Sequence, residues 1–169
     1  SFTSTLAGAA ITLDETGNDF ATFVAAATTG ATVTLQDTNG VILGGITDGA
    51  TGPVTALTIT AGGAVTDSAA SLVSGTTTVT ATGFNVVFDE TGNDFGTLEV
   101  DATDVTLVDT NAIDLGASTV AGLLNVTSGG LATEDITDSG AVSVDGAVTL
   151  TAGAADIILD SANVFDSGG

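Results

Sequence analysis

Residues 14–20 read Asp-Glu-Thr-Gly-Asn-Asp-Phe, and the same seven residues return letter for letter at 89–95. A shortened copy, Asp-Ser-Ala-Asn-Val-Phe, occupies residues 160–165. An apolar triplet precedes each copy, and the copies begin at Asp14, Asp89 and Asp160, which are offsets of 75 and then 71. The chain is therefore a repeat, and a period of this length is typical of solenoids and other stacked folds.

Other segments keep nearly the same period. Residues 34–39 match 106–111 at an offset of 72, and residues 66–68 match 137–139 at an offset of 71. Length changes fall in Gly-, Asp- and Pro-rich stretches, which is how loops on a fixed frame behave. We expect one solenoid segment over 1–169, with repeats at about 11–85 and 86–156 and partial copies at 1–10 and 157–169. Because the chain begins at Ser1 without Met and stops within a repeat, we interpret it as a processed product or an excerpt.

The apolar triplets predict short β-strands. They alternate apolar and polar residues, are rich in β-branched side chains and are bounded by Gly, Asn and Asp. No window shows the spacing of an amphipathic helix, so the fold class is all-β. In the second copy and the start of the third, the expected strands begin near Val86, Leu98, Val105, Ile113, Leu124, Ile136, Val142, Val148 and Ile157.

Strands this short and this evenly spaced predict a parallel β-helix, or β-solenoid. If one coil takes roughly 18–24 residues, one sequence repeat makes three or four coils, and the chain makes about seven to nine. Threonines at alternate positions are expected to face outward, namely Thr58, Thr60, Thr78, Thr80, Thr149 and Thr151. The offset drifts between 67 and 75, which argues against the strict register that an ice-binding threonine face would need.

The composition excludes several function classes. The 169 residues include no Lys, Arg, His or Cys and carry 21 Asp and Glu, a formal charge of −21. Without the usual acid–base and phosphate-stabilising side chains, the chain is predicted not to be an enzyme and to hold no catalytic residue or bound organic cofactor. Without cations it is not expected to bind nucleic acid, and without a long apolar run it is not expected to insert into a membrane.

The repeated heptad allows two interpretations. Its carboxylates are hard oxygen ligands, so Ca²⁺ is the one cofactor that the pattern could bind, although the spacing matches no established calcium loop. As a turn, the same heptad would use Asn and Gly with positive φ and would seat its Phe in the core. The candidate metal ligands are Asp14, Glu15, Asp19, Asp89, Glu90 and Asp94. The candidate turn and core residues are Gly17, Asn18, Phe20, Gly92, Asn93, Phe95, Asn163 and Phe165.

The run Gly-Ala-Val-Thr-Leu-Thr-Ala-Gly-Ala-Ala-Asp-Ile-Ile-Leu-Asp-Ser-Ala-Asn-Val-Phe at 146–165, with its relatives at 11–20 and 108–116, resembles the repeats of giant filamentous-haemagglutinin-like bacterial exoproteins. This resemblance implies a right-handed parallel β-helix, export across an outer membrane, and a fibrous stalk at the cell surface used in adhesion or in building a biofilm matrix. The secretion domain of that family is not in this sequence.

We therefore expect a structural segment of an extracellular bacterial β-helical filament or adhesin stalk. Its expected partners are copies of itself, end to end or within a longer chain, and a host or neighbouring-cell surface. The alternative is a surface-layer protein whose acidic faces are bridged by calcium. A polysaccharide lyase on a β-helix is a third hypothesis, disfavoured because no Arg or Lys is present to act as a base or to stabilise charge.

Overall fold

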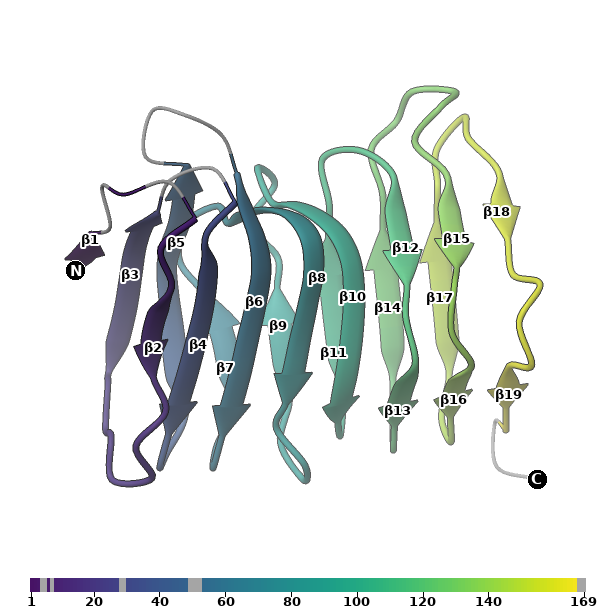
Figure 1. The fold of residues 1–169 in the computed structure, drawn as a ribbon. Helices are drawn as coiled ribbons and strands as arrows, with labels where there is room; N and C mark the ends of the chain where they lie inside the picture. The colour runs from purple at the N-terminus through teal and green to yellow at the C-terminus, as the bar shows by residue number, and fades with distance from the viewer. Residues whose placement is uncertain (4–5, 7, 28–29, 49–52, 167–169) are drawn as a thin grey trace.

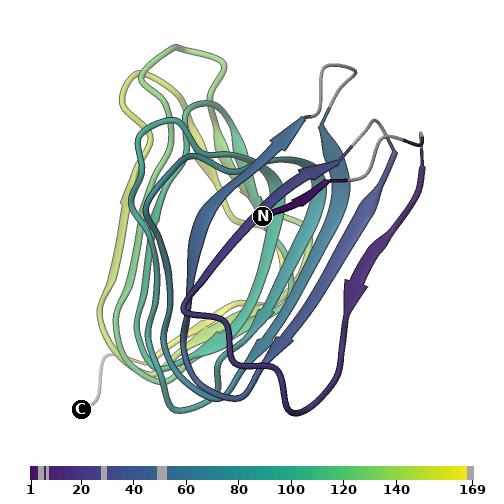
Figure 2. The same cartoon turned by 90° about the vertical axis from the view of Figure 1, so that its left-hand side faces the viewer.

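The computed structural model describes residues 1–3, 6, 8–27, 30–48 and 53–166, and within these residues every regular element is a β-strand. The chain winds around a long axis and alternates between two parallel sheets that face each other (Figures 1 and 2). Neighbouring strands of the eight-stranded sheet belong to successive coils, so its eight strands mark seven steps from one coil to the next. The predicted all-β parallel solenoid is confirmed.

The eight-stranded sheet forms one side of the solenoid and the eleven-stranded sheet the other. The first contains β1 (Phe2–Thr3), β3 (Thr22–Ala27), β5 (Val41–Asp48), β7 (Val65–Asp67), β9 (Val86–Phe88), β11 (Val105–Val108), β14 (Leu124–Thr127) and β17 (Val148–Thr151). The second contains β2 (Ile11–Leu13), β4 (Thr32–Asp37), β6 (Val54–Ala61), β8 (Leu72–Thr80), β10 (Asp94–Ala102), β12 (Ile113–Leu115), β15 (Ile136–Asp138) and β18 (Ile157–Ile158). Its side branch contains β13 (Ser118–Val120), β16 (Val142–Val144) and β19 (Val164–Phe165).

The side branch arises because the later coils bend within the eleven-stranded sheet. β10 runs through the bend as one long strand and pairs with both β12 and β13. In the next coils the side is split into β15 and β16, and then into β18 and β19. The coils also differ in length. The coil that leads from Leu98 to its partner Leu115 is several residues shorter than the coil that leads from Val33 to its partner Leu57.

The core is a column of stacked apolar side chains. Along each strand, every second residue points inward, and the inward residues of successive coils lie in register, as in Leu35–Ile59–Val79. Phe88 and Phe95 are fully buried with ring centroids 5.4 Å apart. Small aliphatic side chains fill most of the remaining interior, which suits the narrow space between two sheets about 10 Å apart.

The core contains one polar defect. Thr77 is fully buried between Leu57 and Leu98 of the neighbouring coils. Among the buried side-chain nitrogen and oxygen atoms in the described part of the chain, only its hydroxyl oxygen has no hydrogen-bond partner. A buried hydroxyl without a partner costs about 1–3 kcal/mol relative to a satisfied one.

Close approach between coils explains the glycines within two of the long strands. Gly75 and Gly96 lie where the register shifts between neighbouring strands. A Cβ at Gly75 would overlap the carbonyl oxygen of Thr55, and one at Gly96 would overlap the carbonyl oxygen of Ser74. Glycine lets the backbones approach at these bulges, which keep the flanking side chains in phase with the core.

The predicted outward threonines are confirmed. Thr58, Thr60, Thr80, Thr149 and Thr151 are exposed, and Thr78 is half-buried on the same outer face. On β4, β6 and β8 the ranks are in strict register, with Thr34 beside Thr58 and Thr58 beside Thr78. On these three strands the outward threonines therefore keep register from coil to coil. No helix in the described residues could span a membrane.

Candidate functional site

The three heptad copies lie at three different turns of the coil. The first follows β2; the stacking path β2–β4–β6–β8 then covers three coils, and the second copy follows the next strand, β9. From β9 the path β9–β11–β14–β17 covers three more coils, and the third copy follows the next strand, β18. One sequence repeat is therefore three coils plus one strand. Counted around the solenoid axis, each copy therefore occupies the next corner of the coil after the corner that the previous copy occupies (Figure 2).

The second copy shows the complete arrangement, in which turns of three successive coils are bonded together. We call residues 67–71, 89–95 and 109–111 the three-tier turn. Its middle residue, Asn93, is fully buried. The Asn93 Oδ1 accepts a hydrogen bond from the backbone N–H of Ser71 at 2.9 Å, and its Nδ2 donates to Asp67 Oδ2 at 2.7 Å. Asp67 also accepts bonds from the backbone N–H groups of Asp89 at 3.1 Å and Glu90 at 3.4 Å.

The following coil closes the three-tier turn from the other side. Asp109 is 2 % exposed, and its two carboxylate oxygens accept hydrogen bonds from the backbone N–H of Phe95 at 2.7 Å and of Asn111 at 3.0 Å. The backbone N–H of Thr110 donates to the carbonyl of Asn93 at 2.8 Å. Turn amides lie outside the strand pairing and need acceptors. Asp109 supplies an acceptor both to the neighbouring coil, at Phe95, and to its own turn, at Asn111.

The electrostatics of this turn reflect a chain without basic side chains. Burial raises the pKa of Asp109 to about 7, although its two backbone hydrogen bonds act in the opposite direction and nearby Asp94 and Glu134 add to the rise. Burial also raises the pKa of Asp67, against the hydrogen bonds from Asn93 and the backbone. With no Lys, Arg or His to pair with, these carboxylates are stabilised by N–H dipoles alone.

The first copy has two of the three tiers. Asp37, which matches Asp109 in the repeat, accepts hydrogen bonds from the backbone N–H of Phe20 at 2.5 Å and of Asn39 at 2.9 Å. No tier equivalent to Asp67 precedes the first copy among the described residues. The Asn18 Nδ2 instead donates to the carbonyl of Leu13 at 3.0 Å, within its own turn.

The third copy has the other pair of tiers. Asp138, which matches Asp67, accepts hydrogen bonds from the Asn163 side chain and from the backbone N–H groups of Asp160 and Ser161. The Asn163 Oδ1 accepts from the backbone N–H of Val142 at 2.8 Å. Burial alone would raise the pKa of Asp138, but these hydrogen bonds outweigh it and lower the pKa. The three copies thus use the same chemistry with different sets of neighbours.

The structure places the candidate metal ligands on the surface of the turns. Asp14, Glu15, Asp19 and Asp89 are exposed, while Glu90 and Asp94 are half-buried. Within the described ranges, no three His, Cys, Asp or Glu side chains gather in a way that could hold a metal ion. Calcium binding by the heptad therefore stays a prediction without a preformed cluster behind it.

The candidate turn and core residues lie as follows. Asn93 and Phe95 are fully buried, whereas Asn18, Phe20 and Asn163 are half-buried. Phe165 is 45 % exposed in β19, the last strand of the stack. The expected positive φ at Gly17 and Gly92 is wrong. The glycines with positive φ are instead Gly8, Gly30, Gly45, Gly83 and Gly153. The heptad turn is closed by a backbone bond, from Asn18 N–H to the Glu15 carbonyl in the first copy and from Asn93 N–H to the Glu90 carbonyl in the second.

Sequence reasoning missed the partners Asp37, Asp67, Asp109 and Asp138. Each belongs to a short segment that repeats at an offset of 71 or 72, so the signal was present. Their contacts with the heptad become visible only when consecutive coils are stacked.

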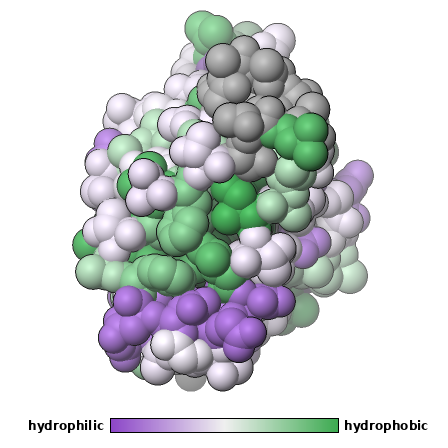
Figure 3. All heavy atoms as spheres, turned by 60° about the vertical axis from the view of Figure 1, so that its left-hand side comes forward, coloured by the Kyte–Doolittle hydropathy of each residue, from purple (hydrophilic) through white to green (hydrophobic). Residues whose placement is uncertain are grey.

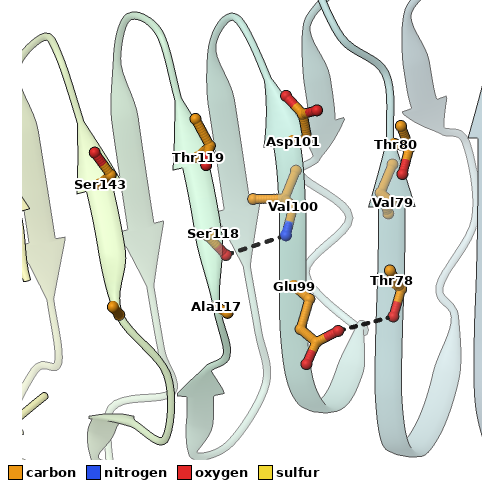
Figure 4. Close-up of a pocket in the computed structure, with 11 residues that line it drawn as sticks. Thr78, Val79, Thr80, Glu99, Val100, Asp101, Ala117, Ser118, Thr119 and Ser143 are labelled. Carbon is orange, nitrogen blue, oxygen red and sulfur yellow. Dashed lines mark hydrogen bonds between the residues drawn. The ribbon is translucent and has the colours of Figure 1, made fainter. Parts of the chain in front are cut away.

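A shallow hollow of about 330 Å³ lies on the outer face of the eleven-stranded sheet, across β8, β10, β13 and β16 (Figure 4). Glu99 and Asp101 project from β10 beside it, and small residues at Ala117 and Ala141 leave the space open. Thr78 donates to Glu99 at 3.1 Å, and Ser118 Oγ accepts from the backbone N–H of Val100 at 3.0 Å. The lining holds hydroxyl, carboxylate and apolar groups.

Comparisons with known proteins agree with the repeat. No curated protein and no solved structure matches this chain. A family model of repeats matches residues 2–27, 30–100 and 102–167, so its two long matches begin one sequence repeat apart and the three together cover nearly the whole chain. The chain therefore belongs to the family described as repeats of unknown function (DUF5649).

Proposed function

We propose that this chain is a structural segment of an extracellular β-helical filament or adhesin stalk, of the kind built by filamentous-haemagglutinin-like bacterial exoproteins. Its work is to supply length and stiffness. The observation that carries this proposal is the continuous parallel stack of eight strands, in which the sequence repeat adds three coils plus one strand at a time. Such a unit can be added any number of times without changing the fold.

The turn chemistry supports a stiff rod. In the three-tier turn, the Asn93 side chain accepts a hydrogen bond from Ser71 of the preceding coil. Asp109, one coil later, accepts a hydrogen bond from Phe95. Bending the stack at this turn would break bonds on buried polar groups, which is costly. The chain also has no Lys or Arg, so trypsin has no cleavage site in it.

Apolar side chains lie at both ends of the stack, which favours the stacking of a further coil, whether from another copy end to end or from a longer chain. The N-terminal end is apolar with a hydrophilic margin (Figure 3), and Phe2, Leu13 and Phe20 pack there against the core as half-buried residues. At the other end Val164 and Phe165 are 56 % and 45 % exposed. The outermost strands also carry unpaired backbone groups, which are a template for another strand.

The proposal is tested by changing the number of repeats. A further copy of residues 86–156 is inserted after residue 156, once or twice, and the particle length is measured by small-angle X-ray scattering and electron microscopy. Each added copy should lengthen a rod of constant width by about 16 Å, the rise of three coils and one strand at ~4.8 Å per coil.

Two outcomes would contradict the proposal. Particles that grow in width, or circular dichroism that shows helix or disorder, would exclude a rod built by repetition. A two-dimensional lattice that forms with Ca²⁺ and dissolves with chelator would instead identify the surface-layer alternative. If the rods, with or without added copies, form equally well in the presence of a chelator, calcium has no role in their assembly.

A further inference from the structure

We propose that the outer face of the eight-stranded sheet is the surface through which two copies of this chain pack side by side. This inference rests on the proposed function, because it identifies how a self-associating rod would form bundles. It starts from one rank of outward side chains that runs in register across seven consecutive strands. The rank consists of Thr22, Ile42, Thr66, Val87, Thr106, Asn125 and Thr149.

No member of this rank is charged, although the chain carries 21 carboxylates. The eleven-stranded sheet differs. Its outward rank Thr34–Thr58–Thr78 continues into Glu99, and the neighbouring rank Thr60–Thr80 continues into Asp101. The rank on the eight-stranded sheet runs from β3 to β17 without a carboxylate, whereas both ranks on the eleven-stranded sheet meet a carboxylate at β10.

This distribution matters because the chain has no cationic side chain to neutralise a partner's carboxylates. Two packed sheets lie about 10 Å apart, which equals the distance over which about 0.1 M salt screens charge. Two copies meeting through Glu99 and Asp101 would therefore repel each other strongly. Two copies meeting through the uncharged rank keep their carboxylates beside it, at the strand ends and turns that border the interface, such as Asp67 and Asp89.

The side chains of the rank also suit sheet-on-sheet packing. Six of the seven are Thr, Ile or Val, which are β-branched and stiff at χ1, so that ordering them in an interface costs little conformational entropy. Ile42 is 40 % exposed and Val87 is half-buried, so apolar surface is present between the threonine methyl groups. Flat ranks of this kind interdigitate between packed sheets.

The size of the face sets the strength of the contact. Seven strands at ~4.8 Å and a width of about 10 Å give a few hundred Å² per copy, below the ~800 Å² per partner of a standard stable interface. Side-by-side pairing of this chain is therefore weak and is strengthened by salt.

The absence of cysteine allows a direct test by single-cysteine cross-linking. Val87 is the middle member of the rank, so Val87 of one copy faces Val87 of the other whether the two rods run parallel or antiparallel. Val87→Cys should give a cross-linked dimer as the main product with a bismaleimide linker that spans about 10 Å in about 1 M NaCl, and much less at low salt. The matched control is Thr80→Cys, which is more exposed but lies on the eleven-stranded sheet, and it should cross-link less.

Equal cross-linking of the two variants, or none at either position, would overturn the inference. Val87→Asp provides a second measurement: its sedimentation in about 1 M NaCl should show monomer where the unchanged chain shows a dimer fraction, with circular dichroism confirming the fold. A dimer that survives Val87→Asp would contradict the assigned face. Failure here leaves the proposed function intact if added repeats still lengthen the rod, so the two proposals can fail separately.

Discussion

The two identical heptads, residues 14–20 and 89–95, have the same sequence and different surroundings. Phe95 is fully buried against Phe88, whereas Phe20 is half-buried near the N-terminal end of the stack. Asn93 is bonded to Asp67 of the preceding coil, whereas Asn18 bonds the Leu13 carbonyl in its own turn. The difference teaches that a solenoid turn takes its stability from the coils on either side of it.

The largest difference is expected at the aromatic position. Phe95→Ala removes a fully buried ring and should lower the free energy of unfolding by about 3–5 kcal/mol. Phe20→Ala removes a half-buried ring and should cost clearly less. Urea denaturation followed by circular dichroism measures both. Equal losses would mean that the neighbouring coils do not determine how much each ring contributes.

The asparagine position should show the same order. Asn93→Ala leaves the buried Ser71 N–H without its acceptor and removes the side-chain hydrogen bond to Asp67, which keeps only its backbone donors, so we expect a loss of about 2–3 kcal/mol. Asn18→Ala breaks one bond in a partly exposed turn, for which about 1 kcal/mol is expected. The same denaturation experiment compares them. An Asn18→Ala loss as large as that of Asn93→Ala would exclude the three-tier turn as the source of the difference.

The buried carboxylate predicts a pH dependence of the complete turn. The pKa of Asp109 is about 7 in the folded chain against an ordinary value of 3.8, so between these values the folded state binds more protons than the unfolded state. The stabilisation from protonated Asp109 is therefore full below pH 3.8 and is lost as the pH rises through 7. We expect thermal unfolding to show a loss on the order of 2 kcal/mol between pH 5 and 8.

The variant Asp109→Asn separates this contribution from the general relief of charge repulsion at low pH. Its unfolding free energy should vary less with pH over the same interval, because the titrating group is gone. An unchanged slope would show that Asp109 does not carry the dependence. Asp138, with its lowered pKa, acts in the opposite sense and destabilises the fold only as the pH falls below its ordinary value of 3.8.

A stabilising change is expected where the copies differ in the core. Thr77 is buried with an unpaired hydroxyl, and the matching residue of the later copy, at an offset of 71, is Val148. Thr77→Val keeps the shape and removes the unsatisfied group, so we expect a gain of about 1 kcal/mol. A rise in the melting temperature measures it. A loss of stability would imply that the hydroxyl has a partner, such as an internal water.

The smallest effects are expected at the heptad glycines, neither of which has positive φ. A methyl group at Gly17 meets open space, so Gly17→Ala should stabilise by roughly 0.4–1 kcal/mol through the unfolded state. At Gly92 the added carbon would lie 3.1 Å from the Ala70 Cβ of the preceding coil, so Gly92→Ala should gain less or lose. Thermal unfolding of the two variants compares them. Matched gains at both sites would contradict the tight stacking of the second copy.

Much of the fold could be predicted from the sequence because strand signals are local. Eight of the nine strand starts expected from Val86 onward agree with the structure, and β10 begins at Asp94, before the expected Leu98. β13 was missed because its inward pair is Ser118 and Val120, so the apolar alternation is broken by a serine that is buried through hydrogen bonds. The alternation of apolar and polar residues therefore identifies a strand whose inward side chains are apolar. It misses a strand in which one inward side chain is a hydrogen-bonded serine.

The arrangement of the turns could not be predicted in the same way. The partner of Asn93 is Asp67 of the preceding coil, and which residues stack depends on the lengths of the intervening coils. These lengths vary from coil to coil, so the repeat period does not reveal by itself whether it spans a whole number of coils. The extra strand in each repeat appears only once the strand pairing is known.

The central claim is that one repeat equals three coils plus one strand, and it is tested most directly by distances between spin labels on exposed heptad positions. Thr16 and Thr91 are replaced by Cys, labelled and measured by double electron–electron resonance together with continuous-wave line broadening, which covers the shorter distances. Thr16 and Thr38 serve as a control pair in adjacent coils, where the Thr38 hydroxyl donates to the Thr16 carbonyl at 2.9 Å. A repeat of three whole coils would stack positions 16 and 91 along one edge at about 14 Å. Our account predicts a clearly longer distance, across the coil to a different turn, and a measured distance equal to the rise of three stacked coils would contradict it.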